Sequence, residues 1–299
     1  MIIFVESGRL GNQLFQYAAL RTLLENNERM VLFGFDDLLS VFDGVQAKVI
    51  PLGRGFRHKL LSKLRPKLEQ IVDNFALVGV VSETFDRNVL SIQIRAGLIG
   101  SIRYAKLAYF QAESAFSDTA VEGLRLKRIH TDKVQRCFAD LQLEGRKKVF
   151  VHIRRGDFLE WPSRQYPAVL PASWYYRCIE RLRGQIDNPF FFFVSDDVHY
   201  VMDVFGDMPH SFISTATAEE DFALMCRCDA GILSPSSFSW WAAYFVNKRV
   251  DGALFCAPEY WGGHRRHEWH PPAISSSFLD LVPVWGQLVR DPAVVSRAQ

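Results

Sequence analysis

The sequence predicts an α/β protein of two domains built on largely parallel β-sheets. Strand-like and helix-like stretches alternate along the second half of the chain, which is the pattern of a doubly wound parallel sheet. The length of 299 residues suits two domains of about 150 residues, each able to bury its own core. We therefore predict an N-terminal domain over residues 1–145 and a C-terminal domain over residues 146–299.

The N-terminal segment predicts a strand, a turn and a helix. Ile2–Val5 is apolar throughout, Glu6–Gly11 is a turn, and Asn12–Asn26 has apolar side chains at helical spacing. The turn lacks the glycine spacing of a dinucleotide-binding loop, so by itself it is a weak indication of a phosphate site. Asn12 and Gln13 stand at the expected start of the helix, where their amides can hold a sugar instead.

The region from about residue 35 to residue 140 shows fewer clear patterns. Tyr104–Phe116 is predicted as a helix. Residues 54–71 combine many basic side chains with apolar residues at helical spacing. Two interpretations of this stretch are open: a basic amphipathic helix resting on an anionic membrane, or a surface helix whose apolar stripe faces the core, which is the commoner arrangement.

The C-terminal half gives the sharpest pattern. Strands are predicted at 147–153, 190–194, 230–233 and 254–257, and helices at 173–183, 217–228 and 235–247. Thr217 and Glu220 form a capping box at the start of the second of these helices. Ser234 is predicted to cap the last helix, with Pro235 as its first residue.

Three polar loops follow predicted parallel strands, so we expect them to meet at one rim of the sheet, where ligands of such folds bind. The loops are His152–Asp157, Ser195–Asp197 and Ser234–Ser239. Arg154 and Arg155 suit a diphosphate, because guanidinium forks bind phosphate oxygens bidentately. Asp157 is placed to orient one of these forks.

The other two loops add acceptors and donors. Ser236 and Ser237 fall in the first turn of a predicted helix, where free N–H groups and the helix dipole attract an anion. Asp196 and Asp197 resemble part of a metal site, but successive side chains of an extended chain point to opposite sides. We therefore predict that these carboxylates accept hydrogen bonds from a ribose and a guanine, and that no metal is bound.

Composition excludes several classes of protein. With 48% hydrophobic residues, 23% charged residues and a net charge of +2, the chain is typical of a globular protein without a nucleic-acid partner. It has no apolar run of the length of a membrane span, and its N-terminus lacks the basic flank of a signal peptide, so we expect a cytoplasmic protein. The five cysteines lack metal or redox spacing and are expected to be reduced and mostly buried.

Six segments, in order along the chain, resemble the bacterial α-1,2-fucosyltransferases (glycosyltransferase family 11), which are related to the protein O-fucosyltransferases and the α-1,6-fucosyltransferases. The segments are residues 8–17, 109–113, 151–158, 192–197, 220–225 and 236–242. The resemblance implies a GT-B type fold of two facing Rossmann-like domains, with the acceptor side in 1–145 and GDP-fucose bound in 146–299. It also implies inverting, metal-independent transfer of L-fucose from GDP-β-L-fucose, without a cofactor, to the 2-hydroxyl of a galactose-terminated glycan, in surface glycan (O-antigen) synthesis.

Residue roles follow from the resemblance. Arg154 binds the β-phosphate with support from Arg155 and Asp157, while Asp221 accepts hydrogen bonds from guanine. The remaining donor contacts implied are Arg9, Gly11, Asn12, Ser195, Asp196, Asp197, Ser236, Ser237 and Phe238. Arg9 stands where this family usually has Gly, but it matches the protein O-fucosyltransferases. Pro235 stands where the family usually has Asn, and it removes one N–H from the expected anion site.

Some alternatives stay open. The base that deprotonates the acceptor is His152, Glu6 or the leaving phosphate. The sugar can go to another hydroxyl or come from another GDP-linked 6-deoxy donor, and a non-catalytic nucleotide-sugar binder is the alternative from a different class. If the stretch 54–71 does bind lipid, the protein is peripheral on the inner membrane.

Overall fold

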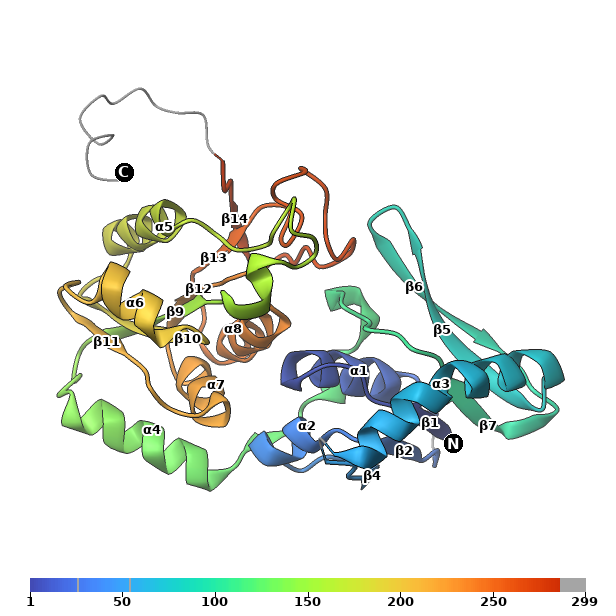
Figure 1. The fold of residues 1–299 in the computed structure, drawn as a ribbon. Coiled ribbons are helices and arrows are strands. Elements are labelled where there is room, and N and C mark those ends of the chain that lie inside the picture. The colour runs from blue at the N-terminus through green and yellow to red at the C-terminus, as the bar shows by residue number, and fades with distance from the viewer. Residues whose placement is uncertain (26, 54, 286–299) are drawn as a thin grey trace.

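The structure, a computed structural model, describes residues 1–25, 27–53 and 55–285 (Figure 1). It contains two six-stranded sheets, which take their strands from residues 2–105 and 147–282 respectively. A short antiparallel pair, β3 (Phe42–Asp43) with β8 (Arg125–Leu126), lies apart from both. Most strand pairs in both large sheets are parallel, so the prediction of an α/β fold with parallel sheets is confirmed.

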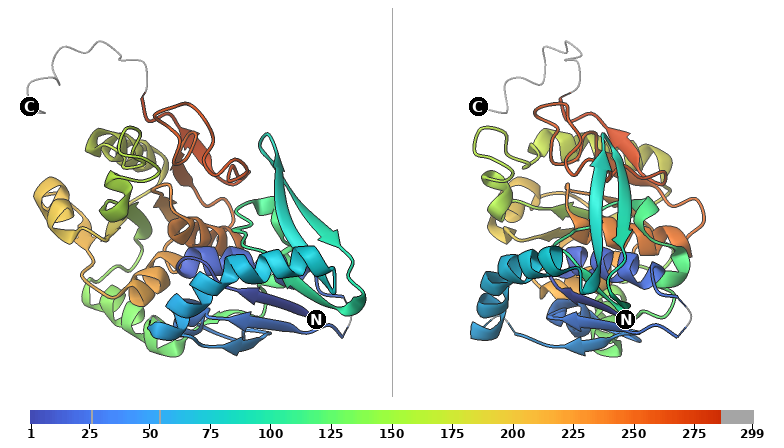
Figure 2. Two further views of the ribbon diagram at one scale, coloured as in Figure 1. Left: turned by 45° about the vertical axis from the view of Figure 1, so that its right-hand side comes forward. Right: turned by 90° about the vertical axis from the view of Figure 1, so that its right-hand side faces the viewer.

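The N-terminal sheet has the order β4-β2-β1-β7-β5-β6. Its strands are β1 (Ile2–Val5), β2 (Met30–Phe33), β4 (Lys48–Ile50), β5 (Val78–Asp86), β6 (Val89–Arg95) and β7 (Ile99–Ala105). Strands β5 and β6 pair antiparallel, whereas the other neighbours are parallel. The β5–β6 hairpin stands out from the body, and its tip lies beside the loop that follows β13 (Figure 2).

Four helices belong to the N-terminal half of the chain: α1 (Leu10–Thr22), α2 (Asp36–Val41), α3 (Phe56–Phe75) and α4 (Arg128–Asp140). Helix α1 starts two residues before the predicted position and ends four residues before it. The N-terminal strand, turn and helix are otherwise as predicted. Within the described residues, no helix has both the length and the apolar character needed to cross a bilayer.

For residues 54–71, of which residue 54 lies outside the described residues, the interpretation that the apolar stripe faces the core is wrong. These residues do form most of a helix, α3, but its apolar stripe faces away from the core, with Leu60, Leu64 and Ile71 all exposed. Arg65 is the one residue of the helix that is buried. The reason is that polar contacts, rather than an apolar stripe, hold the inner face of α3 to the sheet.

The predicted helix at Tyr104–Phe116 is also wrong. Tyr104 and Ala105 end strand β7, and a loop and the short 3-10 helix η1 (Glu113–Ala115) follow. The Glu83 carboxylate accepts hydrogen bonds from the backbone N–H groups of Tyr109 (3.0 Å) and Phe110 (2.8 Å). These long-range bonds satisfy the backbone that a helix would otherwise have to satisfy, and Phe110 adopts a left-handed φ of 52°.

The C-terminal sheet is wholly parallel, with the order β11-β10-β9-β12-β13-β14. Its strands are β9 (Lys147–Ile153), β10 (Pro189–Ser195), β11 (Ser211–Ile213), β12 (Ala230–Ile232), β13 (Phe255–Pro258) and β14 (Asp280–Val282). The helices that cross between them are α5 (Ala172–Gln185), α6 (Val198–Phe205), α7 (Ala218–Cys226) and α8 (Ser237–Arg249). The predicted elements of this half are therefore present, with small shifts at their ends, and the Thr217–Glu220 capping box is confirmed.

The predicted start of the last helix is wrong by two residues. Ser236, not Ser234, caps α8 by accepting from the Phe238 N–H at 3.3 Å. The Ser234 hydroxyl instead accepts from the Arg154 N–H at 2.7 Å and donates to the His152 carbonyl at 2.7 Å. Pro235 lies before the helix, so it removes no N–H group from the helix terminus.

One hydrophobic core runs from the N-terminal sheet into the C-terminal sheet. Helix α1 packs on α8, and Phe15 contacts both Trp240 (4.6 Å between ring centroids) and Trp241 (5.0 Å). Both tryptophans are fully buried. The five cysteines are free and four of them are buried, which confirms that prediction too.

Candidate functional site

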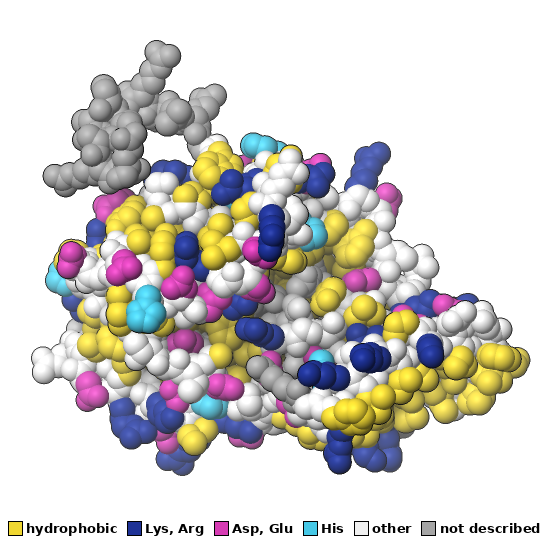
Figure 3. All heavy atoms as spheres, in the orientation of Figure 1, with side chains coloured by type: hydrophobic (Ala, Val, Ile, Leu, Met, Phe, Trp, Pro, Cys, Tyr) yellow, Lys and Arg dark blue, Asp and Glu magenta, His cyan; other side chains and the backbone are white. Residues whose placement is uncertain are grey.

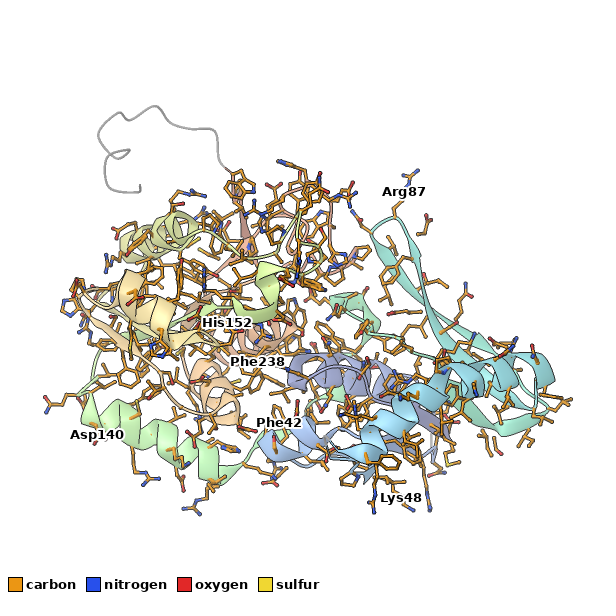
Figure 4. All side chains as sticks on the ribbon, in the orientation of Figure 1. Phe42, Lys48, Arg87, Asp140, His152 and Phe238 are labelled. Carbon is orange, nitrogen blue, oxygen red and sulfur yellow. The ribbon has the colours of Figure 1, made fainter. Side chains whose placement is uncertain are left out.

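A cavity of about 930 Å³ lies between the two halves of the chain. Its walls come from the turn before α1, the hairpin strand β5 and the loop near Tyr109 on one side, and from the ends of β9, β10 and β12 on the other. Figure 4 shows His152 and Phe238 next to each other at this junction, and their ring centroids are 5.6 Å apart. The expected rim at the carboxyl ends of the parallel strands is thus the wall of a cavity.

The N-termini of α1 and α8 meet at the cavity. Gly11 packs directly against Ser237, because a Cβ added to Gly11 would lie 2.5 Å from the Ser237 carbonyl carbon. The side-chain oxygen of Asn12 accepts from the Ser237 hydroxyl at 2.9 Å and from the Gln111 amide at 2.8 Å. Two helix N-termini that face one space concentrate free N–H groups and positive dipole ends there, which favours an anion.

Arg154 lies on the cavity wall between two carboxylates. Its Nε and Nη2 donate to Asp157 Oδ1 at 3.0 and 2.6 Å, and its Nη1 lies 3.1 Å from Asp196 Oδ2. Asp196 approaches closely because residue 156 is glycine: a Cβ there would lie 2.4 Å from Asp196 Oδ2. The guanidinium is therefore fixed in direction before any ligand arrives.

Arg9 supplies the second cation of the lining. It stands at the N-cap position of α1, where its side chain makes no capping hydrogen bond. Among the described residues, Arg9 and Arg154 are the only arginines or lysines that line the cavity. An anion between the halves thus has a cation on each side.

Arg155, predicted to support Arg154, and Asp197, predicted to contact the donor, are both absent from the cavity lining in the described structure. Arg155 Nε pairs with Asp197 Oδ2 at 3.1 Å, and the guanidinium lies 3.5 Å from the ring centroid of Tyr200. Asp197 also caps helix α6 by accepting from the Tyr200 N–H at 3.1 Å. The pair thus holds the start of α6 in place.

Gln13, which was expected to hold a sugar with Asn12, is buried beneath the cavity wall. Its amide donates to Glu6 Oε2 at 3.3 Å and accepts from the Leu38 N–H at 2.8 Å. The Glu6 carboxylate also lies 3.1 Å from His58 Nε2, and Glu6 is not part of the lining. Burial raises the pKa of Glu6.

His152 lines the cavity as a neutral imidazole. Burial, reinforced by the neighbouring Arg154 charge, lowers the pKa of His152 to about 3. Its Nδ1 is buried without a hydrogen-bond partner among the described residues. The ring is therefore a weak base in the free protein.

Asp221 is a buried carboxylate that faces the cavity from the first turn of α7. It accepts a hydrogen bond from the Ser214 hydroxyl. Burial raises the pKa of Asp221 to about 7, against the lowering effect of that bond. A buried carboxylate with free acceptor capacity at the wall of a cavity suits a ligand with paired N–H donors.

The remaining predicted residues, Ser195, Ser236 and Phe238, also line the cavity. The Ser195 hydroxyl donates to the Ile153 carbonyl at 2.7 Å and accepts from the Asp197 N–H at 3.0 Å. It therefore shapes the turn after β10. Phe238 is half-buried and its ring forms part of the wall.

Sequence reasoning missed the aromatic part of the wall. Trp161 stacks on Phe158 (4.9 Å between ring centroids) and lies 5.1 Å from the ring of His270. Glu83 and Tyr109 line the cavity from the opposite half. Trp161 and His270 lie outside the helices and named strands, and Glu83 lies in strand β5, and no local pattern indicated a site at these three positions. Phe158 and Tyr109 lie in segments that carried the family resemblance.

Nothing in the described part of the chain assembles a metal site, since no group of three or more His, Cys, Asp or Glu side chains could hold an ion there. The cavity therefore lies between two mostly parallel α/β sheets, where ligands of such folds bind. The chain belongs to glycosyl transferase family 11, whose model matches residues 3–251. The family recognised from the sequence motifs is thereby confirmed.

The relatives differ in the sugar named. The chain is 25% identical over 277 residues to an α-1,2-colitosyltransferase of Escherichia coli, covering 85% of this chain and 90% of the relative. It is 26% identical over 257 residues to the human galactoside α-(1,2)-fucosyltransferase 1, covering 80% of this chain and 64% of the relative. The fold resembles the crystal structure of POFUT1 in complex with GDP-fucose, with a TM-score of 0.51, 12% identity and coverage of 85% and 96%.

Proposed function

We propose that the protein transfers L-fucose from GDP-β-L-fucose, with inversion, to the 2-hydroxyl of a galactose-terminated glycan in O-antigen synthesis. In this proposal the fold is of the GT-B type, residues 1–145 hold the acceptor and residues 146–299 hold the donor. The family and the names of its members support the sugar and the linkage.

The observation that carries the proposal is the anion site between the halves. Arg154, Arg9 and the N-termini of α1 and α8 converge on one cavity. Breaking the bond between the sugar C1 and the phosphate oxygen builds negative charge on the departing diphosphate. Fixed donors at that position stabilise the transition state more than the ground state.

The two carboxylates beside Arg154 set its role. In the free protein Asp157 and Asp196 hold the guanidinium in place. Asp157 is 62% exposed, so it can turn into solvent and release one edge of the fork to a phosphate. Asp196 stays beside the guanidinium, because its other oxygen accepts from the Arg155 N–H at 2.8 Å.

Two of the three candidate bases fit the site poorly. His152 has a pKa of about 3 and is too weak a base to take the proton of a hydroxyl. Glu6 does not line the cavity. We infer that the proton goes to the leaving phosphate or to a carboxylate of the acceptor wall, for which Glu83 is our candidate because it lines the cavity from the N-terminal half.

The test is a reaction of the purified protein with GDP-fucose and lactose. Release of GDP with formation of a fucosylated lactose is expected, and NMR of the product should show an α-fucose on O2 of galactose. A different linkage would refute the 2-hydroxyl, and binding of GDP-fucose without release of GDP would mean a nucleotide-sugar binder. If transfer is observed, Glu83→Gln should lose turnover and keep GDP affinity.

The named colitosyltransferase gives a second candidate donor. Colitose differs from fucose by lacking the hydroxyl at C3. Parallel reactions with GDP-fucose and GDP-colitose at equal concentration compare kcat/KM for the two sugars. A clear preference for GDP-colitose would reassign the donor and leave the transfer reaction intact.

A further inference from the structure

Helix α3 is attached to the body of the protein through its polar face, which in most surface helices points to solvent. Its buried Arg65 donates from Nη2 to the backbone carbonyls of Val5 (3.1 Å) and Glu6 at the end of β1. His58, two helical turns earlier, pairs with the Glu6 carboxylate at 3.1 Å. The inner face of the helix is therefore polar.

The same polar attachment continues toward the end of α3. The Glu69 carboxylate accepts from the Leu107 N–H at 2.9 Å, and Asp73 pairs with Lys106 at 2.6 Å. The two acidic side chains of the helix are thus engaged with the body of the protein. They contribute little negative charge to its outer face.

The outer face of α3 is apolar. Six residues at helical spacing form a continuous stripe along it, each between 38% and 78% exposed: Phe56, Leu60, Leu64, Leu68, Ile71 and Phe75. Leu77, Leu98 and Ile99 are also exposed; Leu77 follows the end of α3, and the Ile99 N–H bonds to its carbonyl at 2.7 Å. Figure 3 shows hydrophobic side chains running along α3, with Lys and Arg side chains beside them.

The charged residues of the outer face are basic. Arg57, Lys59, Lys63 and Lys67 are exposed, and none of them forms an ion pair with a described residue. A long exposed apolar surface is unusual on a protein that works alone in water and marks an interaction site. An apolar stripe lined with basic residues matches the acyl boundary and the head groups of an anionic bilayer.

We propose that α3 is a membrane-docking helix that lies in the surface of an anionic lipid bilayer. A second copy of the chain fits the stripe less well, because an interface formed by the same face on both copies brings the four basic residues of each against each other. The proposal is independent of the sugar or linkage that the enzyme uses.

The test measures binding of the full-length protein to vesicles by co-sedimentation. Binding is expected to vesicles of phosphatidylglycerol mixed with phosphatidylcholine, to weaken at high salt, and to be absent with phosphatidylcholine alone. Because each basic residue at an anionic surface contributes about fivefold, changing all four to Gln should lower the partition coefficient by more than about tenfold. Changing Leu60, Leu64 and Leu68 to Gln should abolish binding while the charge is unchanged.

A matched control removes the same charge elsewhere on the surface. The four exposed residues to change to Gln are Arg128, Arg136, Arg164 and Arg227. This variant should bind as the unchanged protein does, and all three variants should keep their thermal midpoint, because the substituted side chains are solvent-exposed. Absence of binding to anionic vesicles would overturn the proposal, as would an equal loss in the control variant. Dimerisation in sedimentation velocity that the three leucine substitutions remove, without vesicle binding, would assign the stripe to a second copy instead.

Discussion

Gly11 and Ser237 touch across the boundary between the two halves of the chain. A Cβ on residue 11 would lie 2.5 Å from the Ser237 carbonyl carbon and 2.6 Å from the Phe238 nitrogen, both of them backbone atoms. The contact brings the first turn of α1 onto the first turn of α8, beside the proposed diphosphate site. Only glycine permits this approach.

Gly11→Ala should therefore disturb the site as well as the packing. We expect the free energy of unfolding to fall by about 1–3 kcal/mol, as in other overpacked cores, and GDP affinity to fall with it. Calorimetry and urea titration measure the two effects. Gly184→Ala is the matched control: it lies in helix α5 with open space around the added methyl group, so it should keep affinity and should not lower stability.

Arg154→Lys should lower turnover by roughly 100-fold or more, because an ammonium cannot reproduce a fork that faces a diphosphate. The control is Arg155→Lys, in which the pair with Asp197 and the contact with Tyr200 are weakened outside the cavity. That variant should unfold at a lower temperature and keep turnover within about tenfold of the unchanged protein. Equal losses of turnover would show that the two arginines act as one unit.

Activity should survive excess EDTA. The cations of the cavity are Arg9 and Arg154, and no cluster of metal-ligating side chains is found in residues 1–25, 27–53 and 55–285. Initial rates with and without EDTA, followed by added Mg²⁺ or Mn²⁺, measure this. Loss with EDTA and recovery with metal would return Asp196 to the role of a ligand.

Asp221 should select guanine. Its carboxylate can accept from both N1–H and the N2 amino group, a pair of donors that adenine lacks. Asp221→Ala should weaken GDP at least about tenfold and leave ADP nearly unchanged. Glu220→Ala is the neighbouring control, because Glu220 pairs with Lys133 and does not line the cavity. An unchanged preference for GDP over ADP in calorimetry would mean that guanine is recognised elsewhere.

The pH dependence of GDP binding tests the same carboxylate in the unchanged protein. With a pKa of about 7, Asp221 must lose its proton before it can accept from guanine. GDP affinity should thus fall by up to about tenfold per pH unit below 7. ADP carries the same diphosphate, so it controls for protonation of the diphosphate itself. The ratio of the GDP and ADP affinities then reports the protonation of Asp221 alone.

The free energy of unfolding of the protein without ligand should fall as pH rises, because of the same Asp221 carboxylate. Folding raises the pKa of Asp221 from 3.8 to about 7, so the folded state holds the extra proton between these values and loses stability as pH rises through them. Asp221→Asn should raise the free energy of unfolding at pH 8 by roughly 2–4 kcal/mol. The gain should disappear near pH 4, and an equal gain at both pH values in urea titrations would contradict the assignment.

The C-terminal sheet was predictable because its strands are short apolar runs covered on both faces, as in Phe190–Val194. The N-terminal half was less predictable, because long-range contacts override local pattern there. Glu83 organises the backbone near Tyr109 from another strand. Arg65 turns the apolar face of α3 outward by binding two carbonyls at the end of β1. Neither contact can be predicted from the local periodicity of the sequence.

The residues of the candidate site also divide into those that the sequence could predict and those that it could not. Arg154 and Ser237 were predicted because they follow strands or begin helices, and Asp221 because of the family resemblance; all three line the cavity. Arg155 and Asp197 satisfy the same rule, but they face away from the cavity and pair with each other. A sequence pattern gives the rim of a sheet, whereas the direction of each side chain depends on packing.

The packing of Phe15 against Trp240 and Trp241 limits how this enzyme can open. Because these rings belong to one core shared by both sheets, a hinge rotation that separated the halves would expose them to water, at about 1.5–3 kcal/mol for each large side chain. Opening of that kind is too costly to accompany every turnover. Substrates are then expected to enter and leave past the β5–β6 hairpin and the loop after β13, with the two halves acting as a single rigid frame.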